Sequence, residues 1–301
     1  MNEIKKEVEK YLVLDIGGTF IKYGVINKNY QFYEKGKIHN EIDTNFLKFK
    51  KDLYELYLNI KNKYQIKAIA ISSFGVINKK NNGIYWCTKE RKLYQQLDFK
   101  KIFHNTDFYI ENDANCAAIG ERQFGSLKNI KNAVMITLGT GIGAGIIVNN
   151  KLYKGNNQFA GEVGKMLVNN VAWEDIASVK ALIGMLPNKL KEQLNNYNEI
   201  FNDEIKNHNE EVNQILKQWY QNLAIGIINI CYLFNPQKFI IGGGISSNKS
   251  FNLKELNDEI KKLLLQNHFL IHDNLLEKAI LGNDANLYGA LYLYLKNKTE
   301  K

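Results

Sequence analysis

The spacing of apolar residues predicts strands and a helix in the first part of the chain. Residues 11–17 are a short apolar run, joined by a tight glycine-rich turn to a strand-like segment at 20–26, and a third run over 31–38 would complete a β-meander. Between residues 45 and 64 the apolar side chains return every three or four positions, which indicates an amphipathic helix. Residues 67–72 then predict a buried strand, so this region is a mixed α/β segment.

A similar order of elements follows. Residues 107–110 predict a strand, and the alanine-rich segment after Asp113 predicts a helix that ends at Gly125. Two strands are predicted over residues 133–138 and 142–148, with a glycine-rich loop between them. The strand and loop pattern of the first part is thus used again after residue 130.

Four further elements complete the pattern. They are a helix over residues 173–185 that ends before Pro187, a helix over 212–234 with one long apolar stripe, a strand over 238–241 and a closing helix over 283–295. We expect an α/β protein of two lobes, residues 1–113 joined by the C-terminal helix 284–301, and residues 114–283. Two lobes create an interdomain cleft, the usual place for a small-molecule site.

Composition narrows the class of protein. With 45% hydrophobic and 24% charged residues, the chain of 301 residues has the make-up of a folded soluble protein. Its apolar stretches are shorter than the ~20 residues of a membrane span, and its first ten residues predict no signal peptide. The three scattered cysteines form neither a disulfide framework nor a C-x-x-C site, which indicates a reducing, cytoplasmic setting.

The net charge of +9 raises the question of nucleic-acid binding. Only Arg91 and Arg122 among the 40 basic residues are arginine, the residue favoured for bidentate contacts to phosphates and bases. The lysines are spread along the chain, and no recognition-helix motif is present. We therefore expect no nucleic-acid partner.

Three glycine clusters follow predicted strands. They lie at Gly17-Gly18-Thr19, at residues 139–145 and at residues 242–244. Each could be a simple turn, but glycine also lets backbone N–H groups approach an anion, so three clusters together favour a nucleotide's phosphates. Asp15, just before the first cluster, could hold Mg²⁺ or accept protons from turn amides.

The densest polar cluster is Glu111-Asn112-Asp113-Ala114-Asn115, between a predicted strand and a helix. Asp113 could serve only as a helix N-cap. Two carboxylates and two amides in five residues also suit a polyhydroxylated ligand, whose hydroxyls each donate and accept. A carboxylate beside such a hydroxyl is the general base of phosphoryl transfer.

These motifs, in this order, resemble the ROK sugar kinases. The matching segments are D-I-G-G-T at 15–19, E-N-D-A-N-C-A-A at 111–118, L-G-T-G-I-G-A-G at 138–145, A-G-E-V-G at 160–164 and I-G-G-G-I-S at 241–246. The resemblance implies the two-lobed actin-like ATPase fold, of the hexokinase and ribonuclease H-like type. It also implies ATP and Mg²⁺ as cofactors, a small-molecule sugar as partner and a homodimer.

The resemblance carries roles to individual positions. It makes Asp113 the catalytic base. It places the sugar hydroxyls on Asn112, Glu162, Glu174 and the lysine at 165. The nucleotide and its Mg²⁺ would be held by Asp15, Gly17, Gly18, Thr19, Lys22, Thr140, Gly141, Gly243 and Gly244.

The chain departs from the family at two places. Lys165 stands where most members have a histidine, and residues 166–172 contain no cysteine where most members have a zinc loop, so we expect no zinc. The segment after Gly83 also lacks the family's Asn-x-Pro-Gly-Trp-like motif. Only fourteen residues precede D-I-G-G-T, so we expect no repressor-type helix-turn-helix.

The leading hypothesis is an ATP-dependent kinase acting on the 6-hydroxyl of a hexose or N-acetylhexosamine. N-acetylmannosamine and glucose are the first candidate substrates, and a β-glucoside is third. A sugar-binding sensor or regulator with weak or lost catalysis is the alternative, because of Lys165 and the altered segment after Gly83. Another ATPase of the same superfamily would explain D-I-G-G-T but not E-N-D-A-N.

Overall fold

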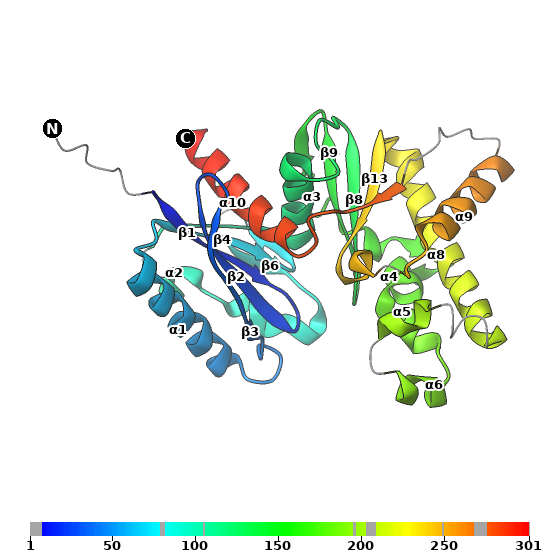
Figure 1. Ribbon diagram of the computed structural model, residues 1–301, viewed down its shortest axis with the longest axis horizontal. Coiled ribbons are helices and arrows are strands. Elements are labelled where there is room, and N and C mark those ends of the chain that lie inside the picture. The colour runs from blue at the N-terminus through cyan, green and yellow to red at the C-terminus, as the bar shows by residue number, and fades with distance from the viewer. Residues whose placement is uncertain are drawn as a thin grey trace. The chain divides into compact units, whose positions relative to one another are not determined.

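The computed structural model describes residues 8–78, 82–104, 106–194, 197–202, 209–248, 250–267 and 276–300. The chain divides into two compact units. Unit 1 combines residues 1–120 with the C-terminal residues 284–301, and unit 2 is residues 121–283. In Figure 1 unit 1 runs from blue through cyan to the green of α3 and returns in red at the C-terminus, and unit 2 runs from green to orange.

Unit 1 is built on a five-stranded sheet in the order β3-β2-β1-β4-β7. The strands are β1 (Lys10–Ile16), β2 (Phe20–Asn27), β3 (Phe32–His39), β4 (Ala68–Ser73) and β7 (Phe108–Asn112). The first three form the expected antiparallel meander, and β4 and β7 continue the sheet parallel to β1. The meander and the two later strands therefore agree with the apolar pattern.

Both faces of β1 are buried, because its alternate side chains enter two different cores. Leu12, Leu14 and Ile16 pack in a cluster with the apolar face of helix α1 (Phe46–Tyr64). Tyr11 and Val13 pack in another cluster with helix α10 (Asp284–Thr299). The C-terminal helix thus completes the core that the N-terminal strand begins.

Helix α3 (Asp113–Phe124) packs closely on α10. A Cβ on Gly120 would collide with the backbone of Ala285, and a Cβ on Gly289 would collide with the backbone of Cys116. The two helices can approach this closely only because both positions lack a side chain. The remaining elements of unit 1 are β5 (Val76–Asn78), β6 (Gly83–Trp86), η1 (Lys89–Gln96) and α2 (Phe99–Ile102).

Unit 2 repeats the strand order of unit 1. Its sheet runs β10-β9-β8-β13-β14, with β8 (Ala133–Leu138), β9 (Ile142–Val148), β10 (Lys151–Tyr153), β13 (Lys238–Gly242) and β14 (Leu276–Lys278). Strands β8 to β10 form an antiparallel meander, and β13 and β14 are parallel to β8. The repeated order of elements predicted from the sequence therefore corresponds to a repeated sheet topology.

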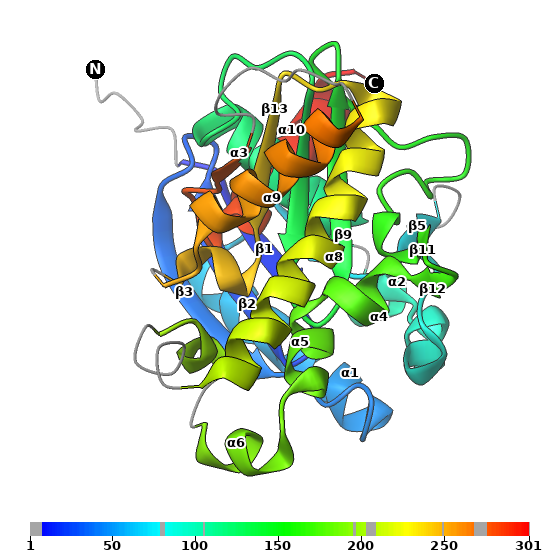
Figure 2. The same cartoon turned by 90° about the vertical axis from the view of Figure 1, so that its right-hand side faces the viewer.

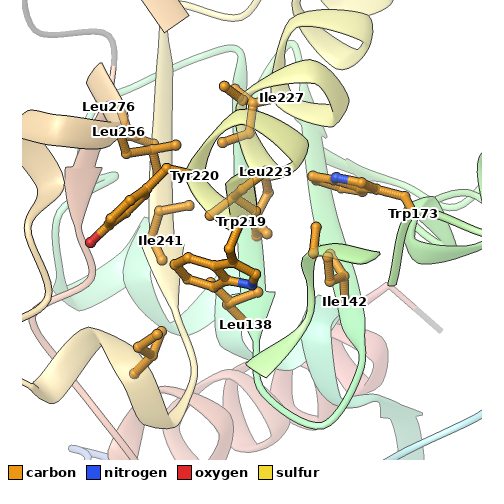
Figure 3. Close-up of a cluster of buried hydrophobic side chains, with 14 of the residues drawn as sticks. Leu138, Ile142, Trp173, Trp219, Tyr220, Leu223, Ile227, Ile241, Leu256 and Leu276 are labelled. Carbon is orange, nitrogen blue, oxygen red and sulfur yellow. The ribbon is translucent and has the colours of Figure 1, made fainter. Parts of the chain in front are cut away.

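The apolar stripe of residues 212–234 forms helix α8 (Glu210–Phe234), which runs alongside helix α9 (Leu253–Gln266) in Figure 2. Trp219, Tyr220 and Leu223 of α8 lie in the core that Figure 3 shows. The other elements of unit 2 are η2 (Val163–Lys165), β11 (Leu167–Val168), β12 (Val171–Ala172), α4 (Trp173–Ala177), α5 (Val179–Met185), α6 (Asn188–Gln193), η3 (Tyr197–Phe201) and η4 (Gly244–Ser247).

The single helix expected over residues 173–185 is wrong. Ser178 has an extended backbone with ψ 166° and separates α4 from α5. Its hydroxyl accepts a hydrogen bond from the N–H of Ala181 at 3.1 Å and caps α5, while its carbonyl accepts one from the indole of Trp219 at 3.0 Å. The buried serine therefore acts as the N-cap of α5, and this interrupts the predicted helix. Among the described residues, no helix has the length and apolar character needed to cross a bilayer.

Candidate functional site

The parallel strands of unit 1 end at one edge of its sheet and bring polar residues into register there. Asp15 of β1 pairs with Ser72 of β4, which pairs with Glu111 of β7. Asn112 lies one position further along β7, and Asp113 begins α3 directly after it. The carboxyl ends of parallel strands are where α/β proteins commonly bind ligands, so this edge is the candidate site of unit 1.

Asp15 is buried, with a residual exposure of 6%. Its Oδ1 accepts hydrogen bonds from Ser72 Oγ and Asn286 Nδ2, both at 2.9 Å, and its Oδ2 lies 3.8 Å from Lys22 Nζ. Burial raises the pKa of Asp15, while Lys22, Ser72 and Asn286 act in the opposite direction. The structure thus places, two residues before Gly17, a buried carboxylate whose charge is partly balanced by Lys22 and two hydrogen-bond donors.

The turn formed by Gly17, Gly18 and Thr19, called here the 17–19 turn, joins β1 to β2. Asn40, which follows β3, fixes its conformation through two hydrogen bonds. Asn40 Nδ2 donates to Gly17 O at 2.6 Å, and Asn40 N donates to Thr19 O at 2.8 Å. Gly18 and Thr19 are exposed. The turn is therefore both ordered and accessible, as a phosphate-binding loop must be.

The polar cluster at the end of β7 and the start of α3 contains residues with different hydrogen-bonding roles. Glu111 is buried, and its Oε1 accepts from Asn112 N at 3.0 Å and from Asn115 Nδ2 at 3.1 Å. Asn112 Oδ1 accepts from Asn115 N at 3.1 Å, which is the capping bond that Asp113 was considered for. Asp113 is half-buried at the first position of α3, where the helix dipole favours negative charge.

In unit 2 two glycine clusters lie at the ends of neighbouring parallel strands. Thr140 and Gly141 lie in the turn after β8, and Gly243 and Gly244 follow β13, with Gly242 paired to Thr137 of β8. Gly243 has φ 86°, and a Cβ there would collide with the backbone of Leu138. The sheet edge therefore carries two adjacent loops that expose backbone groups.

Glu162, Lys165 and Glu174 come together in unit 2. Lys165 Nζ forms an ion pair with Glu174 Oε1, while Glu174 Oε2 accepts from Ile142 N at 3.4 Å. Burial, followed by the charge of Glu174, raises the pKa of Glu162, and Lys165 lowers it. The segment that carries Glu162 docks on β9 through Gly161, whose φ of 100° needs glycine.

Two buried tryptophans fix the helices that follow. Trp173 Nε1 donates to Asn222 O of α8 at 2.9 Å, directly beside Glu174, and Trp219 holds Ser178 as described above. Figure 3 shows both indoles in the core of unit 2. The position of Glu174 is thus set by the core rather than by a flexible loop.

Three residues near these groups were missed by sequence reasoning: Ser72, Arg91 and Asn286. Asn286 lies in N-D-A-N at 283–286, the same tetrapeptide that begins α3 at 112–115, and each copy begins a helix. That repeat is a signal that could have found it. Ser72 and Arg91 carry no comparable signal.

The donor set around Asp15 fits Mg²⁺ that arrives with a nucleotide. Among the residues described, no group of three or more His, Cys, Asp or Glu side chains is arranged to hold a metal. Mg²⁺ commonly uses one or two carboxylates and takes its other ligands from phosphates and water. A single buried carboxylate beside an accessible turn meets that requirement.

Residues 11–297 match the family described as the ROK family, so the chain belongs to this family. An uncharacterized protein of Clostridium perfringens is 32% identical over 95% of this chain and 98% of its own. A β-glucoside kinase of Listeria innocua is 28% identical over 96% of this chain and 98% of its own. The xylose repressor of Bacillus subtilis is 32% identical over 65% of this chain and 53% of its own.

Solved structures show the same fold. A ROK family protein of Streptococcus pneumoniae in complex with sucrose has a TM-score of 0.82, at 24% identity over 97% of this chain and all of that one. A glucokinase of Streptomyces griseus in complex with glucose and AMPPNP has a TM-score of 0.78, at 23% identity over 94% and 98%. The expected actin-like ATPase fold of ROK sugar kinases is confirmed.

Proposed function

We propose that this ROK family chain is an ATP-dependent sugar kinase that phosphorylates the 6-hydroxyl of a hexose or N-acetylhexosamine. The observation that carries the proposal is the sheet edge of unit 1. There the buried Asp15 lies near the end of β1 and the half-buried Asp113 directly follows β7, while Asn112 supplies the helix cap. Asp113 Oδ1 accepts from Ala114 N at 2.9 Å, which holds the carboxylate at the start of α3, where the proposal needs a base.

In the proposed reaction Asp113 accepts the proton of the sugar hydroxyl as that oxygen attacks the γ-phosphorus. The new bond joins the sugar oxygen to phosphorus, the bond from phosphorus to the β–γ bridging oxygen breaks, and ADP leaves with those electrons. Asn112 lies beside Asp113 and donates through Nδ2 to Gly75 O at 3.2 Å, which fixes its amide. Its position suits a second contact to the sugar.

The proposed contacts to the nucleotide are the glycine loops, described for each unit by itself. In unit 1 the 17–19 turn offers backbone N–H groups, and Lys22 offers a cation 3.8 Å from Asp15. When bound, Mg²⁺ would neutralise charge on the phosphates, with Asp15 as the residue that holds it, directly or through water. In unit 2 the proposed nucleotide-binding residues are Thr140, Gly141, Gly243 and Gly244.

Glu162, Lys165 and Glu174 would bind the remaining hydroxyls of the sugar ring. Carboxylates accept from hydroxyls, and the lysine ammonium donates to them as a point charge. Because the ion pair with Lys165 fixes Glu174, the substrate is expected to depend on this lysine. Glucose and N-acetylmannosamine are our leading substrates, and the similarity to a β-glucoside kinase supports a β-glucoside as the third.

The test is ADP release with ATP, Mg²⁺ and a panel of sugars: glucose, N-acetylmannosamine, N-acetylglucosamine, mannose, fructose and cellobiose. One sugar should stand far above the others. Asp113→Asn should keep sugar binding, measured by calorimetry, and lower kcat by about 10²–10⁴. Asp258→Asn, which changes an exposed carboxylate of α9, is the matched control and should leave kcat unchanged. Turnover of Asp113→Asn near the wild-type rate would refute the assigned base.

A sugar-responsive regulator without useful catalysis is the second candidate. Lys165 in place of the family histidine and the similarity to the xylose repressor favour it. Tight binding of one sugar with no ADP release at any sugar of the panel would support this candidate. ADP release that depends on one sugar and on Asp113 would exclude it.

A further inference from the structure

The guanidinium of Arg91 lies directly against the 17–19 turn. A Cβ built on Gly18 would be 2.5 Å from Arg91 Nη2 and 3.1 Å from Nη1. The terminal nitrogens therefore occupy the space that a side chain at position 18 would need. Arg91 thus brings a cation into contact with the candidate phosphate loop.

Arg91 is held in place on two sides. Its Nε lies 3.5 Å from Asp43 Oδ2, and its Cζ lies 4.5 Å from the centroid of the Phe74 ring. Phe74 stacks in turn on the buried ring of Tyr94, with 4.2 Å between the centroids, and Tyr94 shares a hydrogen bond of 2.6 Å with Ser73 at the end of β4. The guanidinium is thus connected to the sheet edge of unit 1 through a chain of packed groups.

The backbone of Arg91 is fixed as well. Arg91 interrupts η1 with φ −113° and ψ 22°, its N–H donates to Thr88 O at 3.0 Å, and its carbonyl accepts from Cys87 Sγ at 3.0 Å. A side chain that starts from a fixed backbone and lies on a fixed ring loses little entropy when it binds a ligand.

The residue type fits a phosphoryl group. Arginine presents several N–H donors in one plane and suits the oxygens of a phosphate, whereas lysine acts as a point charge. The chain uses lysine at nearly all its basic positions, and the other arginine, Arg122, donates to Asn150 Oδ1 at 2.6 Å in unit 2. With Asp43 beside Nε, the two terminal nitrogens remain directed at the turn.

We propose that Arg91 binds the non-bridging oxygens of the phosphoryl group that is transferred, beside the N–H groups of the 17–19 turn. The inference rests on the proposed kinase function and adds a residue to it. Arg91 would take no proton and form no bond; its charge would stabilise the oxygens while the bond to the β–γ bridging oxygen breaks and the bond to the sugar oxygen forms. Its contact is with the γ-phosphoryl group and not with the two phosphates that remain in ADP.

The test compares the binding of AMPPNP and of ADP, both with Mg²⁺, by calorimetry in wild type, Arg91→Gln and Arg91→Lys. We expect Arg91→Gln to weaken AMPPNP binding about tenfold or more, to leave ADP binding within about twofold, and to lower kcat at least about 100-fold. For each of these values Arg91→Lys should lie between wild type and Arg91→Gln. Arg122→Gln is the matched control and should change none of these values.

A second variant keeps the proposal testable if Arg91→Gln unfolds. Asp43→Asn removes the carboxylate at Nε and leaves the stack on Phe74, and it should weaken AMPPNP binding several-fold with ADP binding unchanged. If either variant lost affinity equally for ADP and AMPPNP, or lost affinity only for the sugar 6-phosphate product, the assignment of Arg91 to the γ-phosphoryl group would be overturned. Wild type that binds AMPPNP and turns over, with Arg91→Gln unchanged, would overturn the inference alone. Wild type that neither binds AMPPNP nor releases ADP would instead refute the kinase function.

Discussion

Asn286→Ala should destabilise unit 1 through the carboxylate of Asp15. Asn286 Nδ2 donates to Asp15 Oδ1 at 2.9 Å and also lies 3.2 Å from Ser72 Oγ. A hydrogen bond to a charged group contributes about 1.5–3 kcal/mol, and Asp15 is buried, so little water can replace the lost donor. We expect the free energy of unfolding to fall by about 2 kcal/mol at pH 7.5.

The size of this loss should depend on pH, and its direction follows from the pKa of Asp15. Burial raises that pKa in the folded state above the ordinary value of an aspartate, so the folded protein holds the proton more tightly than the unfolded chain. Stability therefore falls as pH rises from the unfolded pKa to the folded pKa. Asn286 is one of the groups that lower the pKa of Asp15, so its loss extends this fall to higher pH. The difference between wild type and variant should be small near pH 4 and largest at neutral pH.

The assay is urea denaturation of wild type and Asn286→Ala at several pH values between 4 and 8. Asn257→Ala is the matched control, because Asn257 Nδ2 donates to the neutral carbonyl of Leu276 at 3.4 Å. Its loss of about 1 kcal/mol should not change with pH. A loss below about 0.5 kcal/mol for Asn286→Ala, or one equally independent of pH, would show that this bond to Asp15 does not stabilise the protein as argued.

Three further outcomes are expected. Gly226→Ala should lower the free energy of unfolding by about 1–3 kcal/mol or more, and the thermal midpoint with it, because the new Cβ would overlap the indole of Trp173. Gly184→Ala in α5 is the control: its Cβ would enter open space, so it should be neutral or stabilising. Lys165→Met removes a cation that lowers the pKa of Glu162, so Glu162 should become protonated at a higher pH. The pH below which sugar affinity falls should therefore be higher in the variant than in wild type. Identical plots of KM against pH for the two proteins would contradict this role. Purified protein should carry no stoichiometric zinc by elemental mass spectrometry, and a zinc chelator should leave both melting and activity unchanged; loss of either on chelation would contradict a zinc-free protein.

Local pattern predicted most of the long elements. The apolar period of residues 45–64 and 212–234 fixed α1 and α8 within a few residues, because each helix buries one continuous stripe. The order of the strands could not be derived in this way, since β1 contacts β4 across more than fifty residues of chain. The three-residue strands β10 and β14 are too short to show a period.

The candidate site was predicted unevenly. The composition of residues 111–115 pointed to Asp113, but the choice of Asn112 as the helix cap depended on geometry. Family resemblance supplied Glu162 and Glu174, and the ion pair between Glu174 and Lys165 became visible only when η2 and α4 were placed. Arg91 and Ser72 meet Gly18 and Asp15 through tertiary contacts, which a linear pattern does not record.

The discontinuous composition of unit 1 affects the order of events during synthesis. Its sheet and the first part of α3 leave the ribosome before residues 121–283, whereas α10 follows them. At about 5–20 residues per second the ribosome needs on the order of ten seconds for that intervening segment. During this time β1 exposes the face formed by Tyr11 and Val13, and Asp15 lacks its bond from Asn286. Unit 2 is continuous and is made entirely before α10, so the nascent chain reaches the native contacts of Asp15 only after α10 has been made.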